Sequence, residues 1–252
     1  VRNADWANGG QPFYPDGFLP LITSEIRDIA IAGGVRGETA GWNLDLSINY
    51  GTNRLNYGVE NSFNTSLGGL NSPRKFNAGG LRSGQMSVNF DAARSIDFGM
   101  GDTTLALGGE WRNENYKIVP GEVSSYIAGP FTFTNGAAPG SQVFPGFSPT
   151  TAIDASRDSF AGYLELDADI SDIFNVQVAG RYEHFSDFGD TVNGKIAARL
   201  EPVSGLALRG SISTGFRAPG MAQQFFSTTS TNNVAGVGLI EIGTFPVGSP
   251  IA

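Results

Sequence analysis

The sequence predicts an all-β fold: a transmembrane antiparallel β-barrel segment of about eight strands, part of a larger barrel, with long extracellular loops. Several long segments alternate apolar and polar residues, which is the period of a strand whose two faces differ in environment. Glycine supplies 35 of the 252 residues, about twice the usual ~7%, and this favours strands and turns over helices. The connections alternate between short turns and long loops, as in outer-membrane barrels.

The chain begins with residues 1–26, which are rich in glycine, proline and aromatic residues and are expected to form a loop. Eight strands are expected to follow, most of them ~10 residues or longer, the length that a tilted membrane strand needs. No apolar run approaches the ~18 residues of a membrane helix. The expected strands are residues 28–37, 42–50, 81–93, 103–118, 157–169, 174–182, 191–201 and 206–214.

The expected connections differ in length at the two ends of the strands. Short turns are expected at 38–41, 94–102, 170–173 and 202–205, and long loops at 51–80, 119–156 and 218–252. Only the short connection 186–190 breaks this alternation. Within 51–80, alternating Leu55, Tyr57 and Val59 have some strand character. The loop 119–156 is too long for a connection without a function of its own.

The alternating strands predict one apolar and one polar face. Residues 42–50 place Trp42 and Tyr50 at the two ends of a face that is aliphatic between them, as expected of a lipid-facing strand with interfacial aromatic residues. Alternation alone leaves open whether such a face meets lipid or a soluble core. The number of long strands and the asymmetric connections favour lipid.

In a barrel the polar face lines the lumen. Two interpretations of its charges stay open: a solvated lattice of ion pairs between neighbouring strands, which is the commoner case, or a wall that docks a plug or guides a substrate. The candidate lumen residues are Glu110, Arg112, Glu114, Glu165, Asp167, Arg181, Glu183, Lys195, Arg199, Glu201 and Arg209.

Several function classes are disfavoured. A net charge of −8 and a pI near 4.6 argue against nucleic acid as a partner, and without cysteine there are no disulfides or thiolate metal sites. Glu165, Asp167 and Asp169 could gather an oxygen-ligated cation but lack the glycine turn of calcium loops. His184 is the only histidine, and no G-x-S-x-G motif accompanies it. We therefore expect no enzyme activity, catalytic residue, metal or cofactor, and a girdle or loop role for His184.

The long loops carry aromatic residues with two open interpretations. They could stack on an apolar or sugar-like ligand, or they could pack the loops against one another, which is commoner. These residues are Phe131, Phe133, Phe144, Phe147, Phe225 and Phe226.

The last expected strand runs from Leu206 into Pro219, where proline, which has no N–H for a sheet ladder, should end it. The stretch STGFRAPGMAQQFF at 213–226 resembles a signature late in the barrel of TonB-dependent outer-membrane receptors, with Gly215, Phe216, Arg217, Ala218 and Pro219 as its core. Arg217 is expected to be an anchor that pairs with carboxylates on neighbouring strands, or, less favoured, a ligand contact. Further matching motifs lie at 64–68, 109–116, 181–189 and 194–199.

The resemblance implies a function in the outer membrane of a Gram-negative bacterium. Such a receptor would bind a small, scarce nutrient, an iron-siderophore, cobalamin or an oligosaccharide, and a TonB complex would pull on its plug domain to admit it. The family's barrels have about 22 strands, so residues 1–252 are expected to be a partial barrel domain without a plug, cut at both ends. An N-terminal segment unlike a secretory signal agrees with this expectation.

Two other classes stay open. One is a self-contained eight-stranded outer-membrane barrel with a structural or adhesive role, whose interior would be filled by side chains. The other is a soluble β-sandwich that binds a ligand such as a carbohydrate. A closing strand pair would favour the first, and recovery without detergent would favour the second.

Overall fold

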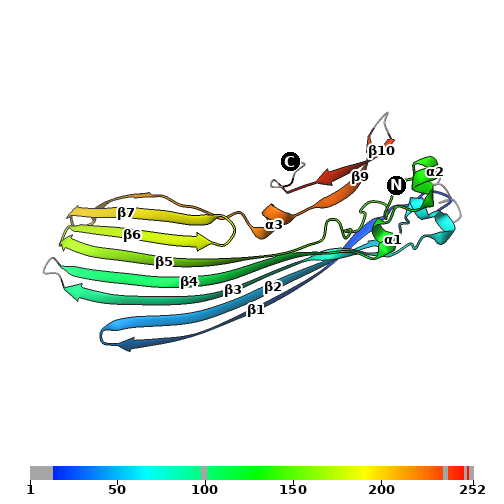
Figure 1. Ribbon diagram of the computed structural model, residues 1–252. Coiled ribbons are helices and arrows are strands. Elements are labelled where there is room, and N and C mark those ends of the chain that lie inside the picture. Colours follow the sequence, from blue (N-terminus) through cyan, green and yellow to red (C-terminus); the bar gives the residue numbers. More distant parts are fainter. Residues whose placement is uncertain (1–13, 98–100, 235–237, 247–248, 250–252) are drawn as a thin grey trace.

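The computed structural model describes residues 14–97, 101–234, 238–246 and 249, and it is dominated by one antiparallel sheet of eight strands in chain order (Figure 1). Every strand pairs with the one before it, so the sheet is a simple meander. This confirms the predicted fold class. The strands are β1 Leu21–Thr39, β2 Trp42–Glu60, β3 Phe76–Asp97, β4 Asp102–Val119, β5 Ile153–Ser171, β6 Phe174–Phe185, β7 Gly189–Val203 and β8 Leu206–Ser213.

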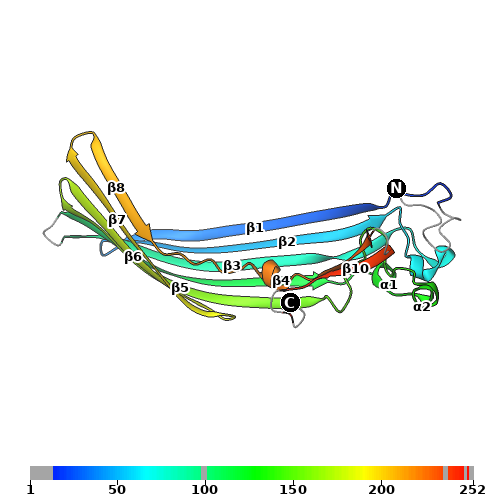
Figure 2. The same ribbon diagram turned by 90° about the horizontal axis from the view of Figure 1, so that it is seen from above.

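The sheet is open. In the described part of the chain, β1 forms one edge and β8 the other, with no ladder between them. The eight strands make a single curved layer (Figure 2), so the structure shows neither a closed eight-stranded barrel nor two packed sheets. Both alternative architectures considered from the sequence are therefore absent from the described residues.

The strands extend further at the loop end than the sequence predicts. The expected loop 51–80 was too long, because β2 continues to Glu60 and β3 begins at Phe76. β1 likewise begins at Leu21, inside the expected loop 1–26, of which residues 1–13 lie outside the described part. β1 and β2 have 19 residues each. At ~3.3 Å per residue such strands are longer than the ~30 Å hydrocarbon core of a bilayer even when tilted, so in a membrane barrel their ends would extend past that core and carry the loops.

Three of the four short turns lie where the sequence predicts them. The turn expected at 94–102 is shorter, because β3 continues to Asp97 and β4 begins at Asp102, and residues 98–100 lie outside the described part. β1 and β2 are joined by Ala40 and Gly41, both with positive φ of 50° and 77°, as a type I′ hairpin turn requires. Two-residue turns at 172–173 and 204–205 join β5 to β6 and β7 to β8. All of these connections lie at one end of the sheet, opposite the helices (Figure 1).

The long loops contain structure that the sequence pattern did not reveal. Residues 120–152 carry α1 Val123–Tyr126 and α2 Pro130–Asn135, and residues 61–75 carry two 3-10 turns. Residues 218–252, expected to be a loop, contain α3 Met221–Phe225 and a hairpin of β9 Thr228–Val234 and β10 Gly238–Thr244. A Thr/Ser/Asn-rich strand such as β9 has no apolar alternation to identify it. Among the described residues, no helix is long and apolar enough to span a membrane.

The buried core sits at the loop end, on the polar face of the sheet. Tyr116 and Ile118 of β4 are buried there with Phe147 of the loop 120–152 and Met221 of α3. A smaller cluster stacks Tyr14 on Phe18 at 4.7 Å between ring centroids. Burial raises the pKa of the Tyr14 phenol above its ordinary value, so it stays protonated and donates a hydrogen bond to the Ser62 carbonyl oxygen.

Candidate functional site

The two faces of the sheet differ as the alternation predicts. One face is apolar and uncovered, with large side chains such as Val35, Phe160, Ile196 and Ile212 exposed. An apolar band of this extent is typical of a surface that meets lipid. The other face carries the charged side chains, and α3 and the long loops pack against its upper part. We call this second face the lumen wall.

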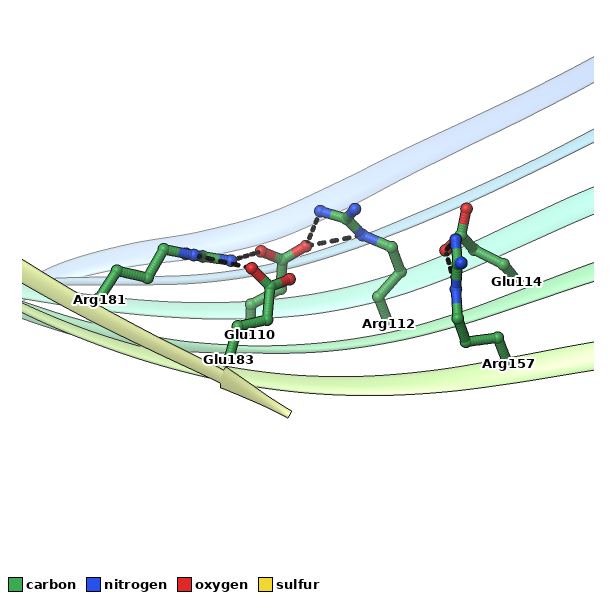
Figure 3. A network of polar contacts seen from close by, with 6 residues as sticks. All are labelled: Glu110, Arg112, Glu114, Arg157, Arg181 and Glu183. Atoms are coloured by element: carbon green, nitrogen blue, oxygen red, sulfur yellow. Dashed lines mark hydrogen bonds and ion pairs between the residues drawn. The ribbon is translucent and has the colours of Figure 1, made fainter. Parts of the chain in front are cut away.

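Four of the predicted lumen residues form one network in the middle of the lumen wall (Figure 3). Glu110 of β4 accepts from Arg181 of β6 at 3.0 Å and from Arg112 Nε at 2.9 Å. Arg181 also donates to Glu183 at 3.3 Å. The intervening strand β5 places Ala161 opposite both glutamates. Its small side chain leaves room for charges two strands apart to meet.

Arg157 of β5 forms a second, more buried centre, which the sequence analysis did not identify. Its side chain is only 3% exposed, and it lies directly opposite Glu114, to which it donates through Nε at 3.1 Å and Nη2 at 2.6 Å. Its Nη1 lies 3.5 Å from Asp187 and donates to the carbonyl oxygen of Pro219 at 2.9 Å. Once the register of β4 and β5 is known, it identifies the Glu114–Arg157 pair directly.

Two aromatic rings complete the surroundings of Arg157. Phe185 and Phe188 stack at 4.4 Å, and the guanidinium lies 5.7 Å and 5.8 Å from their centroids, within cation–π distance. Phe216 packs against both rings. Arg157, which we call the anchor arginine, thus joins β4, β5, the β6–β7 connection and the segment after β8.

The signature segment contacts the lumen wall, but not through the residue expected. Phe216 and the carbonyl of Pro219 make the contacts to the anchor arginine and its rings, while Ala218 is half-buried and Gly215 exposed. Arg217 is exposed and forms no hydrogen bond or ion pair with any described residue. The expected pairing of Arg217 with a strand carboxylate is not observed, because the chain has already left the sheet at Ser213.

Near the turns, amide side chains donate hydrogen bonds to the acidic residues of the lumen wall. Asn175 donates to Asp167 at 2.6 Å and to Asp169 at 3.0 Å, and Gln177 donates to Glu165. Within the described ranges there is no grouping of three potential metal-ligating side chains. Each of these three acids accepts a hydrogen bond from an amide side chain.

The two strands near the open edge carry the remaining cations. Lys195 donates to Gln177 at 2.6 Å. Arg199 pairs with Glu201, while Arg209 lies opposite Arg199 in the register of β7 and β8. No described residue forms a side-chain hydrogen bond or ion pair with Arg209. Most charged residues of the lumen wall thus have a side-chain partner on the same or another strand, while Arg209 on the last strand has none among the described residues.

A tyrosine also crosses the lumen wall. Tyr163 lies opposite Gly108 in the register, and its hydroxyl donates across β4 to Asp91 of β3. A side chain at residue 108 would collide with the tyrosine ring, so glycine is required for this close approach. Once the strand register is known, a tyrosine that lies opposite a glycine is the feature of the sequence that indicates this close approach.

His184 lies on the apolar face at the loop end. Its Nδ1 is 2.7 Å from Asp190, which also accepts from the hydroxyl of Tyr182 at 2.8 Å. All three are exposed. A girdle role for His184, in which polar tips would meet lipid headgroups, stays a prediction.

The loops form a lobe at the end of the sheet that is held together without charges. No acidic, basic or histidine residue occurs in 61–73 or 123–153, and we call these two stretches the neutral lobe. Buried Asn64 joins them, donating to the carbonyls of Ser124 at 3.0 Å and Ile127 at 2.9 Å. Its own oxygen accepts from the amide of Ser66 at 3.0 Å.

The loop aromatic residues divide between the two predicted roles. Phe144, Phe147 and Phe226 pack with one another and with Tyr57, which fixes the lobe to the lumen wall. Phe133 of α2 is 81% exposed and Leu70 is 80% exposed. The inner rings therefore pack the loops together, while Phe133 and Leu70 leave apolar surface exposed on the outside of the lobe.

The family model for the TonB dependent receptor-like β-barrel matches residues 2–245. The siderophore receptor PirA from Acinetobacter baumannii is similar in structure, with a TM-score of 0.58 and 15% identity over 89% of this chain and 30% of that one. A ferric enterobactin receptor (PfeA) mutant from Pseudomonas aeruginosa is also similar in structure, with a TM-score of 0.59 and 14% identity over 89% of this chain and 30% of that one.

A third similar structure is the RagAB peptide transporter, with a TM-score of 0.53 and 11% identity over 93% of this chain and 27% of that one. Nothing matches among curated protein sequences. The chain thus spans about 30% or less of the length of the solved structures it resembles.

Proposed function

The chain belongs to the TonB-dependent receptor-like β-barrel family, and we propose that it is part of the barrel of an outer-membrane receptor that imports a scarce nutrient. One observation carries the proposal: the sheet is apolar and bare on one face, and charged and covered by inward-folded loops on the other. A wall between lipid and a hydrated lumen needs this asymmetry. Proteins of this family are bacterial outer-membrane barrels.

The proposed mechanism involves no covalent chemistry. The loops would capture the nutrient outside the cell, and a TonB complex acting on a plug domain would open the lumen. The lumen wall suits passage, because most of its charges are paired within the wall, as Glu110 is by Arg112 and Arg181. Paired charges keep the surface hydrated while leaving little net field to retain a charged solute.

The fold alone leaves the nutrient undecided. The structural neighbours include a siderophore receptor, a ferric enterobactin receptor and a peptide transporter. Iron-siderophore, cobalamin and oligosaccharide are the candidates of this proposal, and the loops 61–75 and 120–152 with the segment after Ser213 would provide specificity.

Three measurements test the proposal. An antibody to residues 157–219 should detect the receptor in the outer-membrane fraction, and absence from membranes would end the proposal. Deleting the receptor gene should slow growth on its limiting nutrient. Uptake of that nutrient should also stop when a protonophore dissipates the energy supply. Uptake that persists unchanged in uncoupled cells would contradict an energised receptor.

A further inference from the structure

A small cavity lies between the neutral lobe and the first residues of β9. Its volume is about 250 Å³, and it is bounded by Tyr126 of α1, Pro139, Ser148, Thr150, Thr151 and Thr229 among others. None of its lining residues is charged. Two of the elements that line it, α1 and β9, lie at the loop end of the sheet (Figure 1), where the proposed receptor meets its nutrient.

The polar groups of this cavity are hydroxyls. Tyr126 is half-buried, and its hydroxyl has no hydrogen-bond partner among the described residues. The Ser148 and Thr150 hydroxyls lie 2.6 Å apart, and each can donate or accept. Thr229 of β9 also lines the cavity. An aromatic ring and proline provide flat apolar surface beside these groups.

We propose that this cavity binds one ring of a neutral saccharide, and hence that the nutrient is a neutral oligosaccharide; this rests on the proposed function. A sugar ring has apolar C–H faces that stack on a tyrosine ring and equatorial hydroxyls that exchange hydrogen bonds with serine and threonine. The cavity is smaller than the ~300 Å³ at which pockets for drug-sized ligands begin. It therefore fits one ring with the rest of the chain outside.

The absence of charge argues against an anionic metal chelate at this site. Recognition of carboxylates, catecholates or phosphates relies on arginine or lysine, and the neutral lobe contains neither. Transferring an unpaired anion from water into an uncharged cavity costs free energy. The anchor arginine of the lumen wall is already occupied by Glu114 and Asp187.

The cavity floor is fixed before any ligand arrives. The amide of Gly146 donates to the carbonyl of Ser125 at 2.9 Å, and that of Phe147 donates to Ala78 of β3 at 3.0 Å. Phe147 is itself buried in the core. A floor held by backbone hydrogen bonds to the sheet loses little conformational freedom on binding, which favours affinity.

The test uses the full-length receptor in detergent. Binding is first screened on an array of neutral glucans, xylans, mannans and galactans and then measured by calorimetry, with ferric enterobactin as the anionic probe. Tyr126→Phe keeps the ring and removes the hydroxyl, and we expect it to weaken sugar binding roughly 2- to 12-fold, the range for one hydrogen bond. Tyr126→Ala also removes the stacking surface and should weaken binding by more than about tenfold.

Phe133→Ala is the matched control, because Phe133 is an aromatic residue of the same loop that does not line the cavity. Sugar binding that weakens in both Tyr126 variants and not in Phe133→Ala supports the proposal. Equal losses in all three variants, or no neutral sugar bound, overturn it. Tight binding and uptake of the ferric chelate would overturn the saccharide inference while leaving the proposed function intact. Uptake of no nutrient by energised cells would instead remove the proposed function.

Discussion

The lumen wall and the neutral lobe are held together by different interactions. In the lumen wall, glutamates and arginines on neighbouring strands pair with each other, as Glu114 does with Arg157. In the neutral lobe, the buried polar groups are uncharged side chains that bond to backbone carbonyls, as Asn64 does. The two regions meet at Phe147 and Tyr57, which pack the lobe onto the wall.

The two regions use different interactions because water reaches the lumen wall more than the interior of the neutral lobe. Side chains of the lumen wall such as Arg112 and Arg181 stay about one-third exposed, so water still reaches these charges and they are tolerated. The lobe buries Ser62, Asn64, Thr65 and Ser66 almost completely, and a charge there would cost far more than an amide. The comparison indicates that charge is kept where solute and water pass, and excluded where loops must fold compactly.

The anchor arginine is the exception that tests this comparison most strongly, because it is a charge that the structure does bury. Arg157→Met keeps much of its volume but leaves Glu114 and Asp187 without their cation and removes the donor to Pro219. Breaking a buried ion pair costs about 3–5 kcal/mol. We expect a loss of that size in urea unfolding of the full-length receptor in liposomes.

Arg217→Met is the control for this variant. Arg217 lies in the same signature segment and is exposed, so its replacement should change stability by no more than about 0.5 kcal/mol. Equal effects of the two variants would mean that the signature is stabilised by its charge in general and not by the contact of Arg157 with Pro219.

A substitution inside the neutral lobe should destabilise the lobe locally. Asn64→Ala removes the side-chain donor to the carbonyl of Ser124 and one of three donors to the carbonyl of Ile127, at a cost of about 1–3 kcal/mol for buried groups. Because these bonds join two loops and not two strands, we expect faster limited proteolysis of residues 120–152 with little change in global unfolding. Asn71→Ala, at an exposed site of the same loop, should leave proteolysis unchanged. A matching loss in global stability would show that lobe and wall unfold together.

Gly108 tests the packing of the lumen wall independently of its ion pairs. Gly108→Ala would place a methyl group in the ring of Tyr163 and disturb its hydrogen bond to Asp91, which should cost about 1–2 kcal/mol. The neighbouring Gly109→Ala is the control, since its added Cβ would meet nothing closer than 3.5 Å. Urea unfolding of both variants gives the comparison, and an equal cost would point to strand flexibility in place of the tyrosine contact.

The sequence predicted the strands and their faces because both depend on a local period of two. It placed Glu110, Arg181 and Glu183 on one face correctly, and strand register then brought them together. It could not find the role of Arg157, whose partners come from three separate segments, including the carbonyl of Pro219. Contacts of that kind depend on where the chain turns back after β8, and no local pattern records this.

The smallest expected effect lies at the edge of the lumen wall, at Arg209. It faces Arg199 directly across β7 and β8 and has no partner among the described residues, and like charges in that position are mildly destabilising. Arg209→Gln should therefore raise the stability of the full-length receptor by a few tenths of a kcal/mol. The gain should disappear in 1 M salt, where the Debye length is about 3 Å. Arg209→Lys, which keeps the charge, should change nothing. A loss of more than about 1 kcal/mol in Arg209→Gln would instead show that a carboxylate outside these residues pairs with Arg209, which would continue the ion-pair pattern of the lumen wall across its open edge.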